Sequence, residues 1–294
     1  MARKETILTF EEIVYLSDIF VSLGIDKIRL TGGEPLIRKN VPKLVADLAR
    51  LKPDLIDLAL TTNGFDLPRH AAELKGAGLD RVTISLDSLK KDRFTEITGV
   101  DALEKVLAAI GTAKDLGFEP VKINAVIVRG RNEDEVVDFA RFARENEISM
   151  RFIEYMPLDS GHGWSRDLIV SGKEIREMID AAFPLRLRET HRGSGTAWKY
   201  VFADGAPGEI GIIAPVTEMF CGQCSRIRLT ADGQIRTCLF STTEHNLRDH
   251  LRSGVSRAEI VAFIEDVVMK KEPRHYINDA EFVQPVRTMS FIGG

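Results

Sequence analysis

A short apolar strand followed by a helical segment recurs along the first half of this sequence, and this repeat constrains the fold more than any other feature. Strands are expected at residues 27–31, 58–64, 81–87, 121–128 and 148–155. The first of them leads into a glycine loop, Gly32-Gly33-Glu34-Pro35. Before it, the capping-box pattern Thr9-Phe-Glu-Glu12 predicts a helix. Because strands and helices alternate, we expect a parallel sheet with helices outside it.

Polar side chains occupy alternate positions near the C-terminal ends of these strands. The pairs are Arg29 and Thr31, Thr83 and Ser85, Lys122 and Asn124, and Glu154 and Met156, whose thioether is polarisable. Alternate side chains of a strand share a face, and an open sheet covered on both faces would be apolar throughout, so these pairs favour a barrel with a cavity. In parallel barrels, sites form at the C-terminal ends of the strands. The alternative is that these are satisfied core or edge positions.

The sequence changes character after about residue 157. It becomes rich in glycine and turns, with strand-like pieces near 198–202 and 208–213 and helical segments near 246–252 and 257–269. We therefore expect two regions, a larger strand–helix region at 1–157 and a smaller one at 158–294.

The composition excludes two classes of partner. Forty basic and 44 acidic side chains give a net charge of −4, whereas a protein that binds nucleic acid by charge alone has a basic excess. No apolar stretch approaches the roughly 18 residues that span a bilayer. With 44% hydrophobic and 29% charged residues, the sequence predicts a soluble, cytoplasmic globular protein without nucleic-acid or membrane partners.

The three cysteines of the chain all lie in one short stretch. Cys221-x2-Cys224 places two thiols on a tight turn, and Cys238 follows after 13 intervening residues. Three thiolates can converge on one metal centre. A structural zinc site needs four protein ligands, and the nearest histidines, His245 and His250, lie within or beside a predicted helix. An iron–sulfur cluster held by three cysteines would keep one iron open for a substrate.

Two arginines lie between the second and third cysteine. Arg226 and Arg228 are two residues apart, which places them on one face of a strand that ends in a hairpin-like turn at 230–233. Guanidinium groups beside a metal centre suit a ligand that carries phosphate. The alternative is that both are solvated surface arginines.

Taken together, these residues resemble the GTP 3′,8-cyclases, the radical S-adenosylmethionine (SAM) family that begins molybdenum cofactor biosynthesis. The motifs that carry the resemblance are Ile28–Pro35, Leu60–Gly64, Ile84–Asp87, Val121–Asn124, Arg151–Met156, Phe220–Thr230, Cys238–Phe240 and Gly293-Gly294. They cover nearly the whole chain. The run of cysteines and arginines is the most specific, because the Gly-Gly-Glu-Pro loop alone indicates only a radical SAM enzyme of some kind.

The resemblance implies a fold and a reaction. Residues 1–157 would form an α/β fold, an incomplete (β/α)6-type radical SAM barrel that lacks its first strand, and residues 158–294 would bind an auxiliary 4Fe-4S cluster and end in the double-glycine tail. The adenosyl radical would abstract the ribose 3′ hydrogen of GTP, and the carbon radical would attack C8 of guanine to give 3′,8-cyclo-7,8-dihydro-GTP.

The resemblance also implies roles for particular residues. The backbone at Gly33 would approach the SAM methionine moiety, which glycine permits, and Ser85 and Met156 would complete the SAM pocket. The thiolates of Cys221, Cys224 and Cys238 would hold the auxiliary cluster, whose open iron binds guanine. The contacts to GTP would fall on Arg29, Thr61, Lys122, Arg226, Ile227 and Arg228.

One departure from the family concerns the cluster that cleaves SAM. Its Cys-x3-Cys-x2-Cys motif is absent, and the chain has no other cysteine to replace it. Without that cluster no radical can form, so the chain as printed is expected to be a truncated, inactive form, with the SAM cluster present only in a full-length protein. It would be either a fragment of a complete cyclase or a short protein that retains nucleotide binding.

Two other functions remain open at this point. One is a different radical SAM enzyme with an auxiliary cluster, and the other is a non-catalytic protein that binds GTP, an iron–sulfur cluster or zinc. For the cyclase, the product acceptor would be the next enzyme of the pathway, cyclic pyranopterin monophosphate synthase. A homodimer is compatible with the sequence.

Overall fold

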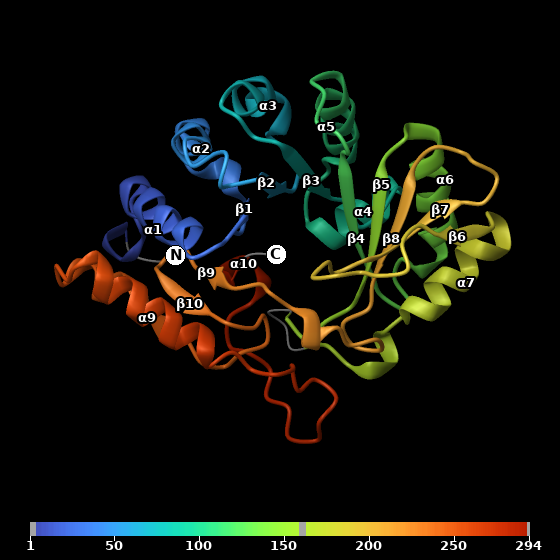
Figure 1. The fold of residues 1–294 in the computed structure, drawn as a ribbon. Helices are drawn as coiled ribbons and strands as arrows, with labels where there is room; N and C mark the ends of the chain where they lie inside the picture. The colour runs from blue at the N-terminus through green and yellow to red at the C-terminus, as the bar shows by residue number, and fades with distance from the viewer. Residues whose placement is uncertain (1–3, 159–162, 293–294) are drawn as a thin grey trace.

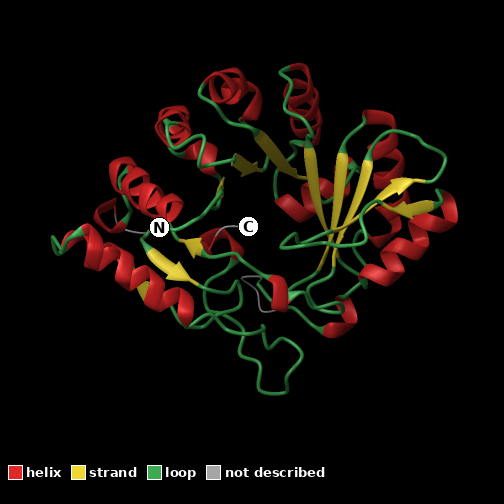
Figure 2. Ribbon diagram, in the orientation of Figure 1, coloured by secondary structure: helices red, strands yellow, loops and turns green. Residues whose placement is uncertain are grey.

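Strands and helices alternate through the first half of the chain in the computed structural model, which describes residues 4–158 and 163–292 (Figures 1 and 2). The strands are β1 (Lys27–Leu30), β2 (Asp57–Thr62), β3 (Arg81–Ser85), β4 (Lys122–Ile127) and β5 (Ser149–Glu154). The helices are α1 (Phe10–Ser22), α2 (Val41–Ala49), α3 (Leu67–Gly76), α4 (Lys91–Thr98), α5 (Leu103–Asp115) and α6 (Val136–Asn146). All five predicted strands are confirmed.

The strands form one curved, mostly parallel sheet in the order β1-β2-β3-β4-β5-β8-β7-β6. Strand β8 (Glu209–Ile213) runs parallel to β5, and β7 (Trp198–Phe202) and β6 (Leu185–Leu187) continue the sheet in antiparallel pairing. Figure 1 shows α1, α2, α3, α5 and α6 on the outer side of the curve. The α/β barrel class is therefore confirmed, with an open edge at β1.

Part of this sheet comes from beyond residue 157. Helix α7 (Gly172–Ala182) precedes β6, so β6–β8 lie in the C-terminal half of the chain but pair with the strands of the first half. The division of the chain at 157 stays a prediction, because pairing in one sheet does not define a boundary.

The main core lies between the sheet and its outer helices. Leu58 and Leu60 on β2 and Ile84 on β3 are fully buried and belong to the same cluster as Val106 on α5 and Phe139 on α6. Burying such a side chain stabilises a fold by about 1.5–3 kcal/mol. The alternation of apolar residues along each strand therefore determines which of its faces packs against the outer helices.

A second core joins helices from opposite ends of the described chain. Helix α1 begins at the predicted capping box, in which the Glu12 amide donates to Thr9 Oγ1 at 3.1 Å and the Thr9 amide donates to the Glu12 carboxylate at 2.7 Å. Helix α9 (Arg257–Met269) lies beside α1 (Figure 1). The buried residues of this second core are Leu8, Leu16, Ile19, Phe20, Ile235, Leu247, Ile260, Ile264 and Val267.

The remaining elements are short. A small antiparallel sheet contains β9 (Arg228–Leu229), β10 (Gln234–Arg236) and β11 (His245–Asn246), and the predicted hairpin between β9 and β10 is confirmed. Helices α8 (Leu247–Arg252) and α10 (Met289–Ile292) follow, with 3-10 turns at Lys4–Thr6, Pro35–Ile37, Glu133–Glu135, Arg166–Leu168 and Cys221–Gln223. Among the described residues, no helix combines the length and apolarity needed to cross a membrane.

Glu154 does not face the barrel interior, so this part of the alternation argument was wrong. Its carboxylate is fully buried and accepts hydrogen bonds from the amides of Gly172 at 2.7 Å, Val216 at 2.9 Å and Thr217 at 3.0 Å. Gly172 begins α7 on the outer side, and a carboxylate is stabilised at a helix N-terminus. Met156 lies beyond the end of β5 and packs against the cluster that contains Leu158.

Candidate functional site

The predicted GTP contacts of the barrel lie on one face of neighbouring strands. In the sheet register, Arg29 pairs with Ala59, Thr61 with Thr83, and Thr83 with Lys122. Arg29 Nη1 donates to Thr61 Oγ1 at 3.2 Å and to Thr83 Oγ1 at 3.3 Å. The structure thus brings Arg29, Thr61 and Lys122 together, and their role toward GTP stays a prediction.

Two further cations share this face, and sequence reasoning missed both. Arg81 on β3 and Arg151 on β5 join Arg29 and Lys122, and we call these four residues the barrel cations. Arg81 pairs with Asp57, with Nε and Oδ1 2.8 Å apart. Arg151 pairs with Asn124 in the sheet register and lies two residues after Ser149, so both side chains are on the same face of β5. This alternation could have identified Arg151 as an inward-facing residue from the sequence.

The barrel cations repel one another. Burial, then the charges of Arg151, Arg81 and Arg29, lower the pKa of Lys122 to about 7, and Glu209 opposes this only in part. Burial and the Arg29 charge lower the pKa of Arg151 to about 10. Lys122 and Arg151 form no ion pair with any residue that the structure describes. An anion bound here would relieve this repulsion.

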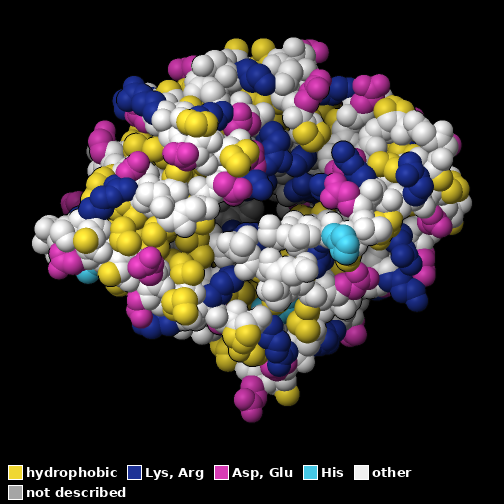
Figure 3. Space-filling model, in the orientation of Figure 1, with side chains coloured by type: hydrophobic (Ala, Val, Ile, Leu, Met, Phe, Trp, Pro, Cys, Tyr) yellow, Lys and Arg dark blue, Asp and Glu magenta, His cyan; other side chains and the backbone are white. Residues whose placement is uncertain are grey.

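Three of the barrel cations, Arg29, Arg81 and Arg151, keep some exposed surface, whereas Lys122 is buried. Figure 3 shows Lys and Arg side chains gathered around a hollow in the middle of this face. Burial lowers the pKa of Arg29, yet the residue keeps an exposed surface. A charged ligand could therefore reach these residues.

The predicted SAM-binding residues lie at one edge of the sheet. Gly33 follows β1, Ser85 ends β3, and Met156 follows β5, so all three are at the C-terminal ends of parallel strands. Glu34 fixes the glycine loop, because its carboxylate accepts hydrogen bonds from Thr62 Oγ1 at 2.8 Å and from the Asn63 amide at 2.7 Å. The contacts of the three predicted residues with SAM stay a prediction.

The end of the described chain approaches the glycine loop. A Cβ atom added to Gly33 would lie 3.7 Å from the carbonyl oxygen of Ser290 in α10. The double-glycine tail, Gly293-Gly294, lies outside the described residues.

The three free cysteines lie on two neighbouring loops, and we call them the three-cysteine site. Cys221 begins a 3-10 turn and Cys224 follows it, whereas Cys238 follows β10. Burial opposes ionisation of Cys224, but the amide and guanidinium of Arg226 outweigh it and lower the pKa of this thiol. Burial raises the pKa of Cys238, and the charge of Glu272 adds to this effect.

The groups that could bind a metal at the three-cysteine site are thiol sulfurs, and a cationic side chain lies beside them. Arg226 Nη2 donates to Cys224 Sγ at 3.3 Å. Among the described residues, no three His, Cys, Asp or Glu side chains are arranged to hold a metal ion. His250, considered as a zinc ligand, stacks on Phe263 instead. A single zinc ion needs ligands about 2.0–2.3 Å from one point, whereas each thiolate of a four-iron cluster binds a different iron.

Arg226 lies near both Arg228 and the barrel cation Arg29. Burial and the charge of Arg226 lower the pKa of Arg228 to about 10, and Cys238 and Cys224 oppose this. The Arg226 charge also contributes, after burial and Arg81, to the lowered pKa of Arg29 on β1. The Ile227 side chain packs against the second core, so only its backbone could contact a ligand at this site.

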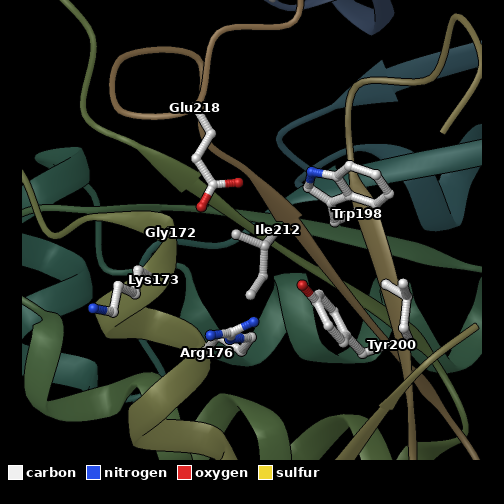
Figure 4. Close-up of a pocket in the computed structure, with 8 residues that line it drawn as sticks. Gly172, Lys173, Arg176, Trp198, Tyr200, Ile212 and Glu218 are labelled. Carbon is white, nitrogen blue, oxygen red and sulfur yellow. The ribbon is translucent and has the colours of Figure 1, made fainter. Parts of the chain in front are cut away.

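A cleft of about 260 Å³ lies elsewhere, on the side of the sheet that α7 covers (Figure 4). Its lining residues are Gly172, Lys173, Arg176, Leu187, Trp198, Tyr200, Ile212 and Glu218, and none of them is a predicted site residue. A smaller cavity of about 70 Å³ lies beside Arg151, Arg192 and Trp198. The candidate site is therefore the open barrel interior and not this outer cleft.

The fold and the glycine loop at the C-terminal edge of its strands define a radical SAM protein. Residues 1–143 match the Radical SAM superfamily, and residues 148–277 match the family Molybdenum Cofactor Synthesis C. Together with the relatives that follow, these matches show that the chain belongs to the GTP 3′,8-cyclase family.

Two curated relatives carry this assignment. The chain is 45% identical over 293 residues to a GTP 3′,8-cyclase of Streptomyces coelicolor, which covers 99% of this chain and 85% of the relative. It is 42% identical over 289 residues to a GTP 3′,8-cyclase of Syntrophomonas wolfei, which covers 98% of this chain and 88% of the relative. The predicted family is therefore confirmed, and both relatives extend beyond the match.

Two solved structures resemble this chain in fold, and the likeness does not extend to function. A structure of tagged anSMEcpe with bound AdoMet has a TM-score of 0.54 at 14% identity and covers 94% of this chain and 74% of its own. The Streptococcus suis SuiB structure, bound to the precursor peptide SuiA, has a TM-score of 0.50 at 18% identity and covers 59% and 39%. At these identities the likeness concerns backbone architecture.

Proposed function

We propose that this protein acts as a GTP 3′,8-cyclase, which converts GTP to 3′,8-cyclo-7,8-dihydro-GTP by SAM-derived radical chemistry. The observation that carries the proposal is the group of mutually repelling barrel cations, which faces Arg226 across the same space. A triphosphate carries the compensating negative charge and matches guanidinium groups in geometry.

The substrate is held from two sides in this proposal. Arg29, Thr61 and Lys122 bind it from the barrel, and Arg151 adds a further charge that faces the same space. Arg226, Ile227 and Arg228 bind it from the C-terminal region, Ile227 through its backbone. The barrel residues and residues 226–228 come from different parts of the chain, so together they can hold the nucleotide at both ends. A nucleotide held in this way keeps the ribose carbon close to C8, which favours the attack.

The three-cysteine site would hold the auxiliary 4Fe-4S cluster. When bound by Cys221, Cys224 and Cys238, this cluster keeps one iron free to bind guanine. The thiol donors and the adjacent Arg226 guanidinium support this choice, because thiolates are the ligands of such clusters and a cation stabilises the ionised form.

SAM would bind at the C-terminal edge of the strands, at Gly33, Ser85 and Met156. The cluster that cleaves SAM needs three more thiolates, and the printed chain has three cysteines in total, all at the three-cysteine site. The residues of this chain do not fit that cluster.

Nucleotide binding tests the proposal directly. Titration calorimetry with GTP should give a saturable binding curve, and ATP should bind more weakly once the auxiliary cluster is in place. Equal affinity for GTP and ATP at a reconstituted site would contradict the assignment of guanine to the open iron. Absence of saturable GTP binding would contradict the proposal.

Metal content tests the three-cysteine site separately. After anaerobic incubation with iron and sulfide, the protein should turn brown and retain iron and sulfide after gel filtration. Colourless, zinc-loaded protein from the same treatment would contradict the cluster. The proposal also includes a cytoplasmic location, which cell fractionation tests. It includes transfer of the product to cyclic pyranopterin monophosphate synthase, which a coupled assay tests, and a homodimer, which light scattering tests.

A further inference from the structure

The segment directly after α9 contacts both loops that carry the three cysteines. Helix α9 ends at Met269, and the side chain of Lys271 then turns toward these loops. Its Nζ atom donates to the carbonyl oxygen of Arg226 at 2.8 Å and also to that of Thr237. Arg226 lies two residues after Cys224, and Thr237 directly precedes Cys238. One ammonium group therefore joins the two loops.

Two neighbours of Lys271 extend the same contact. The Glu272 carboxylate accepts a hydrogen bond from Thr237 Oγ1 at 2.6 Å. The backbone amide of His275 donates to Cys221 Sγ at 3.4 Å. Its buried ring is fixed by a 2.8 Å contact between Nε2 and the carbonyl oxygen of Pro215 and by edge packing on Phe240. The segment 271–275 thus reaches the loop or the sulfur of every cysteine at the site.

Lys271 also places a positive charge among these thiols. The Lys271 charge lies near both Cys224 and Cys238, and the opposite charge of Glu272 lies near Cys238 as well. Cations and hydrogen bonds near cluster sulfurs stabilise the cluster and raise its reduction potential, because the reduced cluster carries more negative charge.

We propose that Lys271 is a positioning residue of the three-cysteine site, which fixes the Cys221–Cys224 turn relative to Cys238 and supplies the counter-charge of the thiolates. The inference rests on the proposed function, because the cluster at these cysteines is part of that proposal. It adds a residue that touches neither GTP nor SAM and acts through two backbone carbonyl groups and through its charge.

The neighbouring lysine provides a matched control. Lys270 is exposed, and its Nζ pairs with Asp266 four residues earlier on α9. Lys271→Met removes the ammonium group that joins the two loops, Lys271→Arg keeps the charge, and Lys270→Met removes a surface charge of the same sign one residue away.

The first experiment measures the reconstituted cluster. Protein reconstituted anaerobically with iron and sulfide is titrated with a reductant and followed by electron paramagnetic resonance. We expect Lys271→Met to lower the reduced fraction at a fixed potential several-fold and to lose iron faster in a chelator. Lys271→Arg should recover most of the potential, and Lys270→Met should match the wild type. A wild-type potential and iron retention in Lys271→Met would overturn the proposal.

A second experiment uses the metal-free protein, so that failure of the cluster assignment can be distinguished from failure of this inference. The rate of backbone amide hydrogen exchange in the Cys221–Cys224 turn and around Cys238, read by peptide mass spectrometry, should rise several-fold in Lys271→Met and stay unchanged in Lys270→Met. Equal rates in all variants would overturn the role of Lys271 even if the cluster forms. Should Lys271→Met fail to fold, Lys271→Gln is measured in the same way, with the same expectation.

Discussion

Arg29 on β1 and Thr61 on β2 are joined by a hydrogen bond of 3.2 Å between Nη1 and Oγ1. Both residues are predicted contacts of one nucleotide, and the bond holds the guanidinium in place before any ligand arrives. A group that is already ordered loses less conformational entropy when it binds. The barrel half of the candidate site is therefore preorganised around this pair.

Replacement of the C-terminal arginines should weaken GTP binding. Arg226→Ala and Arg228→Ala each remove a guanidinium group that is proposed to bind GTP, so the dissociation constant should rise several-fold or more, as measured by titration calorimetry. The surface variant Arg257→Ala, which loses an ion pair with Asp18 and a hydrogen bond to Ser22 Oγ away from the site, serves as control. An unchanged affinity in both site variants would refute the substrate assignment.

Lys122→Met should weaken GTP binding but stabilise the folded protein. The Lys122 ammonium is buried among like charges, so its removal should raise the free energy of unfolding by roughly 1–3 kcal/mol near neutral pH. The same variant should bind GTP roughly tenfold more weakly, because it loses a phosphate contact. Urea unfolding and calorimetry measure the two effects, and Lys173→Met on the exposed side of α7 is the control. A destabilised Lys122→Met would contradict the repulsion inferred here.

The affinity for GTP should depend on pH through Lys122. The pKa of Lys122 is about 7 in the free protein, and a bound triphosphate favours the charged form and raises this pKa. Affinity is therefore greatest below about pH 7 and declines as pH rises through this value. Because arginine stays charged, Lys122→Arg should flatten the profile between about pH 6 and about pH 9. Identical profiles in the two proteins would contradict this assignment.

The lowered pKa of Lys122 also determines how the contribution of this residue to the free energy of unfolding changes with pH. The unfolded chain holds the Lys122 proton up to its ordinary pKa of about 10.4, whereas the folded protein releases it near 7. Between these values the unfolded state binds more protons, so this residue's contribution to the free energy of unfolding rises with pH. Denaturant titrations of wild type and Lys122→Met should converge as pH increases across this window.

Gly233 should tolerate no side chain at the hairpin beside the cysteines. Its φ is +77°, and an added Cβ would lie 2.4 Å from Cβ of Arg248. Gly233→Ala should therefore destabilise the protein by about 2–4 kcal/mol, from strain and the clash together. Gly254 has a φ of +79° with no atom within 4 Å of the added Cβ, so Gly254→Ala shows the backbone strain alone. Thermal unfolding of the two variants measures the difference, and equal losses would rule out the clash.

Glu154→Gln should destabilise the junction between β5 and α7. In glutamine one of the two carboxylate oxygens is replaced by an NH2 group, which would face either the Gly172 amide or the amides of Val216 and Thr217 and leave those buried hydrogen bonds unmade. We expect a loss of about 1–3 kcal/mol in the free energy of unfolding. Glu177→Gln, on the exposed surface of α7, should change stability by less than about 0.5 kcal/mol. Equal stability of both variants in urea would show that the buried carboxylate is dispensable.

Local sequence patterns determined much of the architecture. The period of two in each strand predicted that Arg29, Thr83 and Lys122 share a face, and the register confirms it. The capping box at Thr9 set the start of α1. These features depend on residues within a few positions of one another, which is why the sequence alone could specify them.

Tertiary structure decided what depends on distant neighbours. Alternation placed Glu154 inside the barrel, but the buried amides of α7 and of the Val216 turn hold its carboxylate on the outer side. Arg151 had the same ambiguity and turned inward. The pairing of β8 with β5 and the contacts of Lys271 join segments far apart in the chain. A polar residue's direction and partners follow from which remote groups satisfy its hydrogen bonds and charge, and only the assembled fold supplies those groups.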